Sequence, residues 1–588
     1  MREYRTHYCD EITVKDVGQK VRIAGFVETI RDLGGLVFLD IRDMYGITQA
    51  VTSGNSEDVE FASHIPVESA VKIIGEVRKR DEETLNKKIA TGEVEVVVEE
   101  IEILGKRTKS LPFDVSDSKN VREDLRLQYR FLDLRKKDLK DRIVLRAQVM
   151  QHLREKMIEK GFIEIQTPIL TSSSPEGARD YLVPSRVHPG KFYALPQAPQ
   201  QFKQLLMVSG FDRYYQIAPC FRDEDPRADR SPGEFYQIDF EMSFATQEDV
   251  FNVIETILPK VFKANTDWKV DEGPFIRIPY KESMEKYGCD KPDLRNPLII
   301  SDLTDIFEGT EFNAFKEKTV KAIVTENMED KPRKFFDSMS EYAVEELGAK
   351  GLAWVKVDSE NNLNGGISKF IDDDRKNQIF IKMNVESNSA IFFIADEFEK
   401  AQKIAGGVRI KLGNEFDLLE KDIYKFCFIV DFPMYELSDE GKIDFNHNPF
   451  SMPQGGMKAL LEKNPLDIYA YQYDLVCNGF EVASGAVRNH DQEIMIKAFE
   501  IAGYTVEDVK GKFGALFNAF SYGTPPHAGA AAGIDRIIML LAKEDNIREV
   551  IAFPKNKKAR DLLMNAPSKV FDKQLDEVHI KLNLENKN

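Results

Sequence analysis

The stretch from Cys220 to Met242 constrains the fold most, because it is predicted to form a β-hairpin with polar side chains along one face. On its second arm one face carries Tyr236, Ile238, Phe240 and Met242, and the other carries Phe235, Gln237, Asp239 and Glu241. This alternation is the period of two of a β-strand. The central loop DPRADRSPG has turn-forming residues and two arginines that a turn does not need. A solvated hairpin with paired charges is one interpretation. The other is a site in which Phe235 stacks on a base and the arginines hold phosphates.

Three motifs in the chain resemble those of class II aminoacyl-tRNA synthetases. F-R-D-E-D from Phe221, R-x-D-R and E-F-x-Q-x-D resemble motif 2, in the form found in bacterial-type aspartyl-tRNA synthetases. HAGAAAGIDR, starting at His527, resembles motif 3. An apolar stripe from Leu139 to Met157 predicts a helix that ends at Gly161, and a predicted strand, FIEIQTPIL, follows it. This unit is similar to motif 1, which builds the dimer interface in that family, so a homodimer is expected.

Composition limits the class of protein. With 588 residues, 42% hydrophobic and 31% charged, the chain is expected to be globular and to have several domains. Five scattered cysteines without a CxxC pair favour a reducing cytoplasm and argue against zinc. No signal peptide or membrane-spanning run is predicted, and neither a membrane nor DNA is expected as a partner. A net charge of -18 is not typical of RNA-binding proteins, but local basic clusters such as Arg78 to Arg80 leave that function open.

The predicted architecture is α+β and multidomain. Five short strands between Lys20 and Leu104 predict an OB-fold β-barrel. The resemblance adds a class II catalytic core on an antiparallel sheet, with an inserted α+β domain. The expected division is a barrel at 1–107, a hinge at 108–138, the first part of the core at 139–285, an inserted domain at 286–413, the second part of the core at 414–558 and a C-terminal extension at 559–588.

The resemblance also implies the roles of individual residues. Catalytic roles fall on Arg222, Glu481 and Arg536. Aspartate binding falls on Glu176, Gln200, Lys203, Arg222, Asp239, His447 and Arg488. ATP binding falls on Arg222, Asp223, Glu224, Ser231, Phe235, Glu481, Gly533, Ile534, Asp535 and Arg536. Anticodon binding by the barrel falls on Glu28, Arg31, Phe38 and Gln49; from the pattern alone, Phe38 is as easily an ordinary core residue.

The oxygen ligands expected for Mg²⁺, which is bound with ATP, are Asp474 and Glu481. Strict alternation would place Glu481 and Arg488 on opposite strand faces, so a bulge or turn at Ala483 to Gly485 is predicted between them.

The reaction implied is that of an aspartate–tRNA ligase. The α-carboxylate of L-aspartate attacks the α-phosphorus of ATP, and aspartate then passes to the 3′ end of tRNA(Asp). Whether tRNA(Asn) is a second acceptor stays open. No general base is needed, since a carboxyl group with a pKa of about 3.5 is ionised at neutral pH. Three alternatives stay open. They are an asparaginyl-tRNA synthetase, which Lys203 and Arg488 argue against, a non-catalytic tRNA-binding paralogue, and an AMP-forming amide synthetase, which would not need the barrel.

Overall fold

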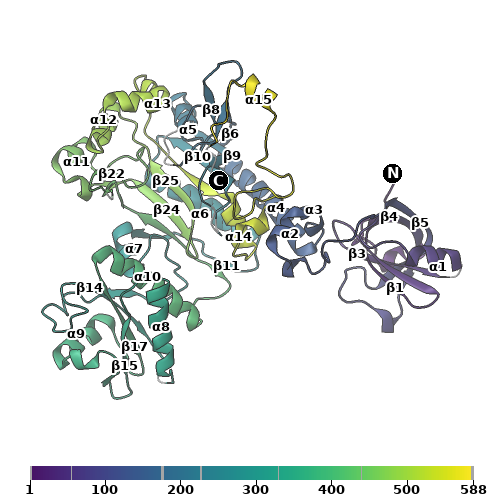
Figure 1. Cartoon of the computed structure of the whole chain (residues 1–588), viewed down its shortest axis with the longest axis horizontal. Coiled ribbons are helices and arrows are strands. Elements are labelled where there is room, and N and C mark those ends of the chain that lie inside the picture. Colours follow the sequence, from purple (N-terminus) through teal and green to yellow (C-terminus); the bar gives the residue numbers. More distant parts are fainter. Residues whose placement is uncertain are drawn as a thin grey trace. The chain divides into compact units, whose positions relative to one another are not determined.

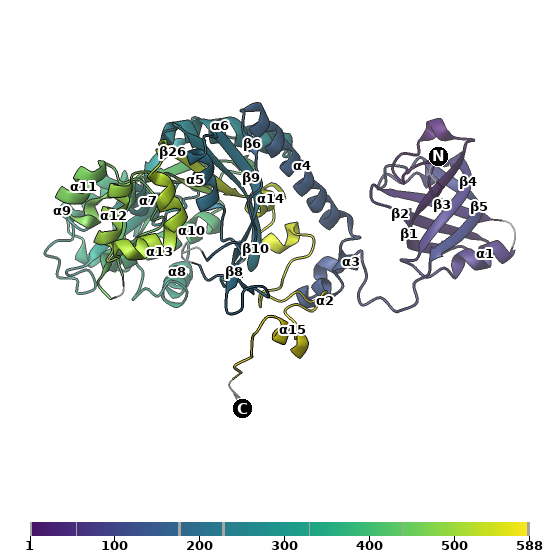
Figure 2. The same cartoon turned by 90° about the horizontal axis from the view of Figure 1, so that it is seen from above.

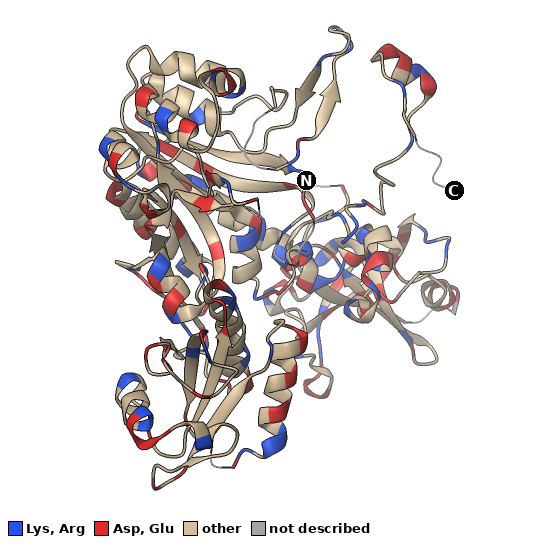
Figure 3. Cartoon of the chain, turned by 60° about the vertical axis from the view of Figure 1, so that its left-hand side comes forward, with Lys and Arg blue, Asp and Glu red and all other residues tan. Residues whose placement is uncertain are grey.

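The computed structural model describes residues 3–53, 56–173, 178–225, 228, 230–328, 330–438 and 440–584. The chain divides into two compact units, Met1–Asp141 and Arg142–Asn588 (Figure 1). None of the helices in the described part of the chain combines the length and hydropathy needed to cross a bilayer. Acidic and basic residues both occur along the helices and strands (Figure 3).

The first unit contains a closed five-stranded barrel with the strand order β1-β2-β3-β5-β4 (Figure 2). The strands are β1 (Lys20–Asp32), β2 (Leu36–Arg42), β3 (Ile47–Ser53), β4 (Ala70–Lys79) and β5 (Val94–Gly105), and α1 is Ser56–Ser63. Alternate residues such as Val37, Leu39 and Ile41 are fully buried in the barrel interior. The five strands predicted between Lys20 and Leu104 are observed, and the OB-type barrel is confirmed.

The segment after the barrel is more ordered than its polar sequence indicates. It forms α2 (Glu123–Gln128) and α3 (Arg130–Asp133) around a small apolar cluster of Phe113, Val115 and Leu132. Arg135, which follows α3, donates to Glu68 of the barrel at 2.8 Å. The apolar residues of this cluster are spaced along the chain without the period of a helix, so the sequence predicts a hinge here rather than two helices.

The second unit is built on an eight-stranded sheet with the order β12-β19-β24-β25-β26-β10-β9-β6. Its strands are β6 (Ile163–Glu164), β9 (Arg213–Arg222), β10 (Gly233–Ser243), β12 (Ile276–Pro279), β19 (Phe426–Val430), β24 (Gln472–Cys477), β25 (Phe480–Val487) and β26 (His527–Gly533). The six central strands pair antiparallel, and only the two edge pairs are parallel. This confirms the antiparallel sheet predicted for the core.

Helices cover the sheet and close the main core. They are α4 (Lys137–Glu159), α5 (Gln200–Val208), α6 (Gln247–Ala264) and α14 (Ile534–Leu541). Leu153 and Met157 of α4 pack into this core beside Ile254 of α6 and Phe240 of the sheet. The predicted end of α4 is also observed, because Gly161 has the left-handed φ of 78° that stops a helix.

The strand expected after α4 is much shorter than predicted. Of the residues FIEIQTPIL, only Ile163–Glu164 pair as a strand, in parallel with β9. The segment is the last strand of the described sheet, with β9 as its one neighbour, and Pro168 has no N–H to donate to a longer pairing.

The inserted segment forms its own antiparallel sheet, in the order β13-β14-β17-β15-β16. Its elements are α7 (Tyr280–Tyr287), β13 (Ile300–Asp302), β14 (Thr319–Thr325), α8 (Arg333–Glu345), β15 (Ala353–Val357), β16 (Leu363–Asn364), α9 (Asp373–Met383), β17 (Ala390–Asp396) and α10 (Phe398–Glu415). Helices α8 and α10 pack on one face and α9 on the other, each with its own apolar cluster (Figure 1).

The remaining elements surround the core. They are β7 (Leu182–Pro184), β8 (Phe192–Ala194), β11 (Lys269–Val270), β18 (Ile423–Tyr424), β20 (Phe432–Pro433), β21 (Tyr435–Leu437), β22 (Ile443–Phe445), α11 (Gly456–Glu462), β23 (Tyr469–Ala470), α12 (Gln492–Ile501), α13 (Val506–Phe520) and α15 (Asp572–Glu577). No residue of α15, the last helix, is buried in the described structure.

Candidate active site

Strands β9 and β10 form the predicted hairpin. Arg222 pairs with Gly233 next to the loop, and Asp239 pairs with Gln216 further along. Ile238, Phe240 and Met242 face the core, as the alternation predicted, while Asp239 and Glu241 are buried on the opposite face. The polar face of the hairpin therefore belongs to an interior site, and the interpretation as a solvated hairpin is wrong.

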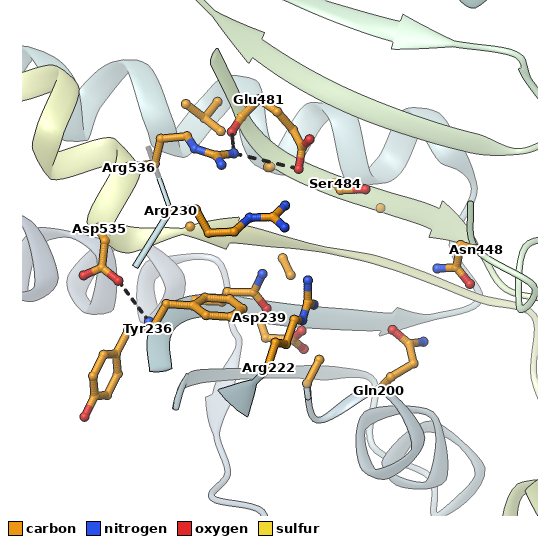
Figure 4. A pocket seen from close by; sticks show the side chains of 18 of the residues that line it. Gln200, Arg222, Arg230, Tyr236, Asp239, Asn448, Glu481, Ser484, Asp535 and Arg536 are labelled. Carbon is orange, nitrogen blue, oxygen red and sulfur yellow. Dashed lines mark hydrogen bonds and ion pairs between the residues drawn. The ribbon is translucent and has the colours of Figure 1, made fainter. Parts of the chain in front are cut away.

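That face lines a cavity of about 290 Å³. The lining includes Gln200, Lys203, Arg222, Glu224, Arg230, Ser231, Phe235, Asp239, His447, Asn448, Glu481, Ser484, Arg488, Gly533, Asp535 and Arg536. Gln200 and Asn448 lie at the opposite end of the cavity from Asp535 and Arg536 (Figure 4). Residues far apart in the sequence are thus brought together by β10, β25, β26 and the ends of α5 and α14.

Three residues of the cavity lining, Lys203, Asp239 and Arg488, form a cluster of four buried charges with Glu241. Lys203 Nζ lies 3.0 Å from Asp239 Oδ2 and 3.2 Å from Glu241 Oε2. Arg488 donates through Nε to Glu241 Oε1 at 2.8 Å and through Nη2 to Oε2 at 3.1 Å. All four side chains are at most 2% exposed. The cluster holds two cations and two carboxylates, so it is neutral as it stands.

The two carboxylates of the cluster titrate differently. Burial raises the pKa of Asp239 to about 6, and the Glu241 charge adds to this rise, while Lys203 opposes it. Burial also raises the pKa of Glu241, but Arg488 and Lys203 outweigh burial, so the net shift is downward. Asp239 Oδ1 has no hydrogen-bond partner among the described residues. Asp239 thus has a free acceptor for a cationic group of a ligand.

Glu241 was not predicted as a site residue, although it orients both Lys203 and Arg488. The signal was present, because Glu241 shares the polar face of the hairpin with Asp239. Gly529 of β26 makes room for it, since a Cβ at that position would lie 2.3 Å from Glu241 Oε2. A close approach of this kind is one of the few that require glycine.

A chain of neutral hydrogen bonds supports Gln200. Gln200 Nε2 donates to Gln204 Oε1 at 3.2 Å, and Gln204 Nε2 lies 3.1 Å from Nε2 of His527. His527 Nδ1 lies 2.8 Å from the carbonyl of Pro525. Burial lowers the pKa of His527 to about 4, so the ring is neutral at pH 7, donates through Nδ1 and accepts at Nε2.

The other end of the cavity carries arginines and an aromatic ring. The Arg222 guanidinium lies 5.1 Å from the centre of the Phe235 ring. Arg230 pairs with Glu224, and Arg536 donates to the backbone carbonyl of Glu481. This end suits an anion with an attached planar base.

Three residues expected around ATP have other surroundings. Asp223 lies outside the cavity lining, and its Oδ2 is 3.8 Å from Nε of Arg179. Ile534 is fully buried in the main core. Asp535 lines the cavity, but its carboxylate pairs with Arg146 and accepts from the backbone N–H of Tyr236 at 3.2 Å.

Asp474 and Glu481 lie on adjacent strands. Asp474 pairs with Ser484, and the register shifts so that Val476 pairs with Glu481. A bulge therefore lies between Glu481 and Arg488, as predicted, but its additional residue is Val482, one position before the predicted Ala483 to Gly485. It places Glu481 on the same face as Arg488. Burial and the neighbouring Glu481 raise the pKa of Asp474 well above its usual value, and its Oδ1 has no partner among the described residues. The carboxylates of Asp474 and Glu481 suit Mg²⁺, which is coordinated by few carboxylates together with substrate phosphates.

Two family models match the chain. The model for tRNA synthetases class II (D, K and N) matches residues 122–557, and that for the OB-fold nucleic acid binding domain matches residues 21–104. The chain belongs to the class II tRNA synthetases. This is the family that the three sequence motifs predicted.

Close relatives of this synthetase share its whole length. Proteins named Aspartate–tRNA(Asp/Asn) ligase from Rickettsia bellii (strain OSU 85-389) and Rickettsia akari (strain Hartford) are 55% and 56% identical to it. Each match covers 99% of this chain and 98% of the relative.

Solved structures with the same fold include enzymes for two amino acids. The aspartyl tRNA synthetase from Entamoeba histolytica has a TM-score of 0.59 and 20% identity, covering 93% of this chain and 91% of that one. The asparaginyl-tRNA synthetase from Pyrococcus horikoshii complexed with asparaginyl-adenylate has a TM-score of 0.57 and 19% identity, covering 93% and 97%. These likenesses show the fold, and the fold alone does not distinguish the two amino acids.

In the barrel of this synthetase, three of the four predicted anticodon residues share one surface. Arg31 lies beside Phe38 in the register and donates to Gln49 Oε1 at 2.9 Å. Phe38 is half-buried on this polar surface, while its neighbours Val37 and Leu39 fill the barrel, so Phe38 is not a core residue. Glu28 is the additional residue of a bulge in β1 and lies 3.5 Å from Arg42.

Two residues predicted to bind the amino acid remain to be placed. His447 lies at the exposed rim of the cavity, with Nδ1 2.8 Å from the carbonyl of Asn446. Glu176 lies outside the described residues.

Proposed function

We propose that this chain is an aspartate–tRNA ligase. It activates L-aspartate with ATP to aspartyl-adenylate, releases pyrophosphate, and transfers aspartate to the 3′ end of tRNA(Asp). The observation that carries this proposal is the buried cluster of Lys203, Asp239, Glu241 and Arg488 beside a cavity rich in arginine. The names of the full-length Rickettsia relatives support it.

The cluster selects aspartate by its balance of charge. The ammonium of the amino acid binds at the free oxygen of Asp239, which gives the neutral cluster one surplus positive charge. The side-chain carboxylate of aspartate, held by Lys203 and Arg488, removes that surplus. The amide of asparagine would leave it buried and uncompensated, and such a charge is costly. His447 is proposed as a third donor to the side-chain carboxylate, Glu176 as a second negative group near the ammonium, and Gln200 as a further contact of the amino acid.

The first chemical step needs positioning and neutralisation of charge. The ionised α-carboxylate attacks the α-phosphorus, and Arg222 stabilises the charge that develops there. Phe235 stacks on adenine, Glu224 reads its amino group, and Arg536 holds the leaving pyrophosphate at the far end of the cavity. Ser231, Gly533 and Asp535 line the same cavity, and Asp223 and Ile534 are proposed to support the ATP site from outside the lining. Mg²⁺, when bound by Asp474 and Glu481, supplies Lewis-acid neutralisation of the phosphates.

We also propose that tRNA binds through the barrel, with Phe38 stacked on a base, Arg31 and Gln49 beside it, and Glu28 at the edge. The protein works in the cytoplasm, where its substrates are. It is proposed to act as a homodimer, because Ile158, Ile163 and Phe244 are each more than half exposed near the end of α4 and the β9–β10 hairpin.

The test is ATP–pyrophosphate exchange with aspartate and with asparagine in parallel. Exchange with aspartate alone is expected. Exchange with asparagine alone would identify an asparaginyl enzyme, and exchange with neither would indicate a non-catalytic paralogue. Charging of purified tRNA(Asp) and tRNA(Asn) then establishes which acceptors are used, and sedimentation at micromolar concentration tests the dimer.

A further inference from the structure

Lys291, in the loop that follows α7, reaches the catalytic sheet. Its Nζ lies 3.1 Å from Oε2 of Glu481 and 3.6 Å from Oδ2 of the adjacent Asp290. Neither the sequence motifs nor the roles proposed above include this lysine.

The loop that carries Lys291 is firmly held. The buried Arg409 of α10 donates to the backbone carbonyls of Asp293 at 3.1 Å, Asn296 at 2.7 Å and Leu298 at 2.6 Å. The β24–β25 turn approaches the same loop, because a Cβ on Gly479 would lie 3.3 Å from Asp293. The fold therefore fixes the loop that carries Lys291 beside the strand that carries Glu481.

The charges around Lys291 are those of a cation site. Glu481 and the buried Asp474 repel each other, and Asp290 adds a third carboxylate. A lysine with its usual pKa of about 10.4 is an ammonium at pH 7, and Nζ of Lys291 faces two of these carboxylates, Glu481 and Asp290. Nη1 of Arg536 lies 3.9 Å from Oε1, the other carboxylate oxygen of Glu481.

We propose that Lys291 is the resident cation of the Glu481 carboxylate and that a divalent metal must displace it. A metal bound at about 2.1 Å from a Glu481 oxygen would stand close to Nζ, and two cations at that spacing repel each other. Asp290, already 3.6 Å from Nζ, is the partner to which Lys291 moves. Lys291 is thus a positioning residue that holds Glu481 in place before Mg²⁺ and ATP arrive. The inference rests on the proposed metal role of Glu481.

The test measures Mn²⁺ binding to the full-length protein without ATP or aspartate, from the signal of free Mn²⁺ in electron paramagnetic resonance. Lys291→Met removes the competing charge at nearly constant length, and we expect it to tighten Mn²⁺ binding at least tenfold. Lys291→Arg, which keeps the charge, is expected to stay within about twofold of the parent. Lys286→Met is the matched control, since Lys286 lies on α7 and pairs with Glu282 at 2.7 Å.

A second pair of variants connects the effect to Glu481. In a Glu481→Gln background, Lys291→Met is expected to change Mn²⁺ affinity less than twofold. Unchanged or weaker Mn²⁺ binding in Lys291→Met alone would overturn the proposal, as would equal tightening in Lys286→Met or persistence of the effect without Glu481. Failure of pyrophosphate exchange with aspartate would instead refute the proposed function and leave the Mn²⁺ result as it stands.

Discussion

Replacing Glu241 with glutamine tests the buried cluster most directly. The carboxylate accepts from Arg488 at 2.8 and 3.1 Å and pairs with Lys203 at 3.2 Å. Glutamine has nearly the same shape, but it offers a single acceptor oxygen and turns its NH₂ group toward one of two cations. Because the cluster is neutral, the substitution leaves one buried positive charge without compensation.

The expected cost follows from that charge. Removing one partner of a buried ion pair costs about 3 to 5 kcal/mol of unfolding free energy. The remaining amide oxygen keeps one hydrogen bond, so we expect a loss of about 3 kcal/mol of unfolding free energy. Arg488 also loses its fixed orientation, and kcat/KM for aspartate in pyrophosphate exchange is expected to fall about 10- to 100-fold.

Urea unfolding followed by tryptophan fluorescence measures the first quantity. The chain has two tryptophans, and Trp268 packs against the main core, whereas Trp354 lies in the inserted segment. A Trp354→Phe background therefore makes the emission report on the catalytic core. Glu234→Gln on the same strand is the control, because Glu234 is exposed, and it should change stability by less than about 0.5 kcal/mol. A loss below about 1 kcal/mol in Glu241→Gln would refute the charge argument.

Three further changes test other parts of the site. With an Asp239 pKa of about 6, KM for aspartate should rise about tenfold between pH 7 and pH 5, since the protonated acid no longer attracts the ammonium; a flat KM over this range contradicts the assignment. Phe38→Ala should weaken tRNA charging by about 1 to 3 kcal/mol and leave pyrophosphate exchange unchanged, whereas Arg222→Ala should abolish both activities. Equal losses in both assays for both variants would contradict the separate roles proposed for the barrel and the active site. Gly529→Ala should destabilise the core in thermal unfolding, because its Cβ would lie 2.1 Å from the carbonyl oxygen of Phe240; Gly511→Ala on α13, where nothing lies within 4 Å, should not.

Much of the fold follows from local patterns in the sequence. The barrel strands and the β9–β10 hairpin alternate with a period of two, and α4 carries a helical stripe that ends at Gly161. Each of these signals lies within one element, so it survives without knowledge of the neighbours. The length of β6 did not follow, because pairing at a sheet edge depends on what lies beside the strand.

The site was predictable where one strand carries several of its residues. Alternation alone places Asp239 and Glu241 on the same face of β10, opposite Ile238 and Phe240. It does not indicate their partners, and Arg488 is separated from Glu241 by 247 positions in the chain. Lys291 and Glu481 are a further pair of this kind, joined only by the packing of the inserted segment's first loop against β24 and β25.

The structure changes the reasoning about selectivity more than the list of residues. From the sequence, Lys203, His447 and Arg488 indicate a positive pocket that attracts a dicarboxylate. In the folded protein Lys203 and Arg488 are already neutralised by Asp239 and Glu241, so an attraction between opposite net charges cannot select the substrate. In the binding mode proposed above, the ammonium and the side-chain carboxylate of aspartate enter the cluster together and preserve its neutrality. Asparagine would bring only the ammonium to the cluster, because the α-carboxylate of either amino acid is directed toward ATP. Asp239 and Glu241 therefore weaken the attraction of Lys203 and Arg488 for a free carboxylate. They also make asparagine costly to bind, because it leaves the cluster with an uncompensated positive charge.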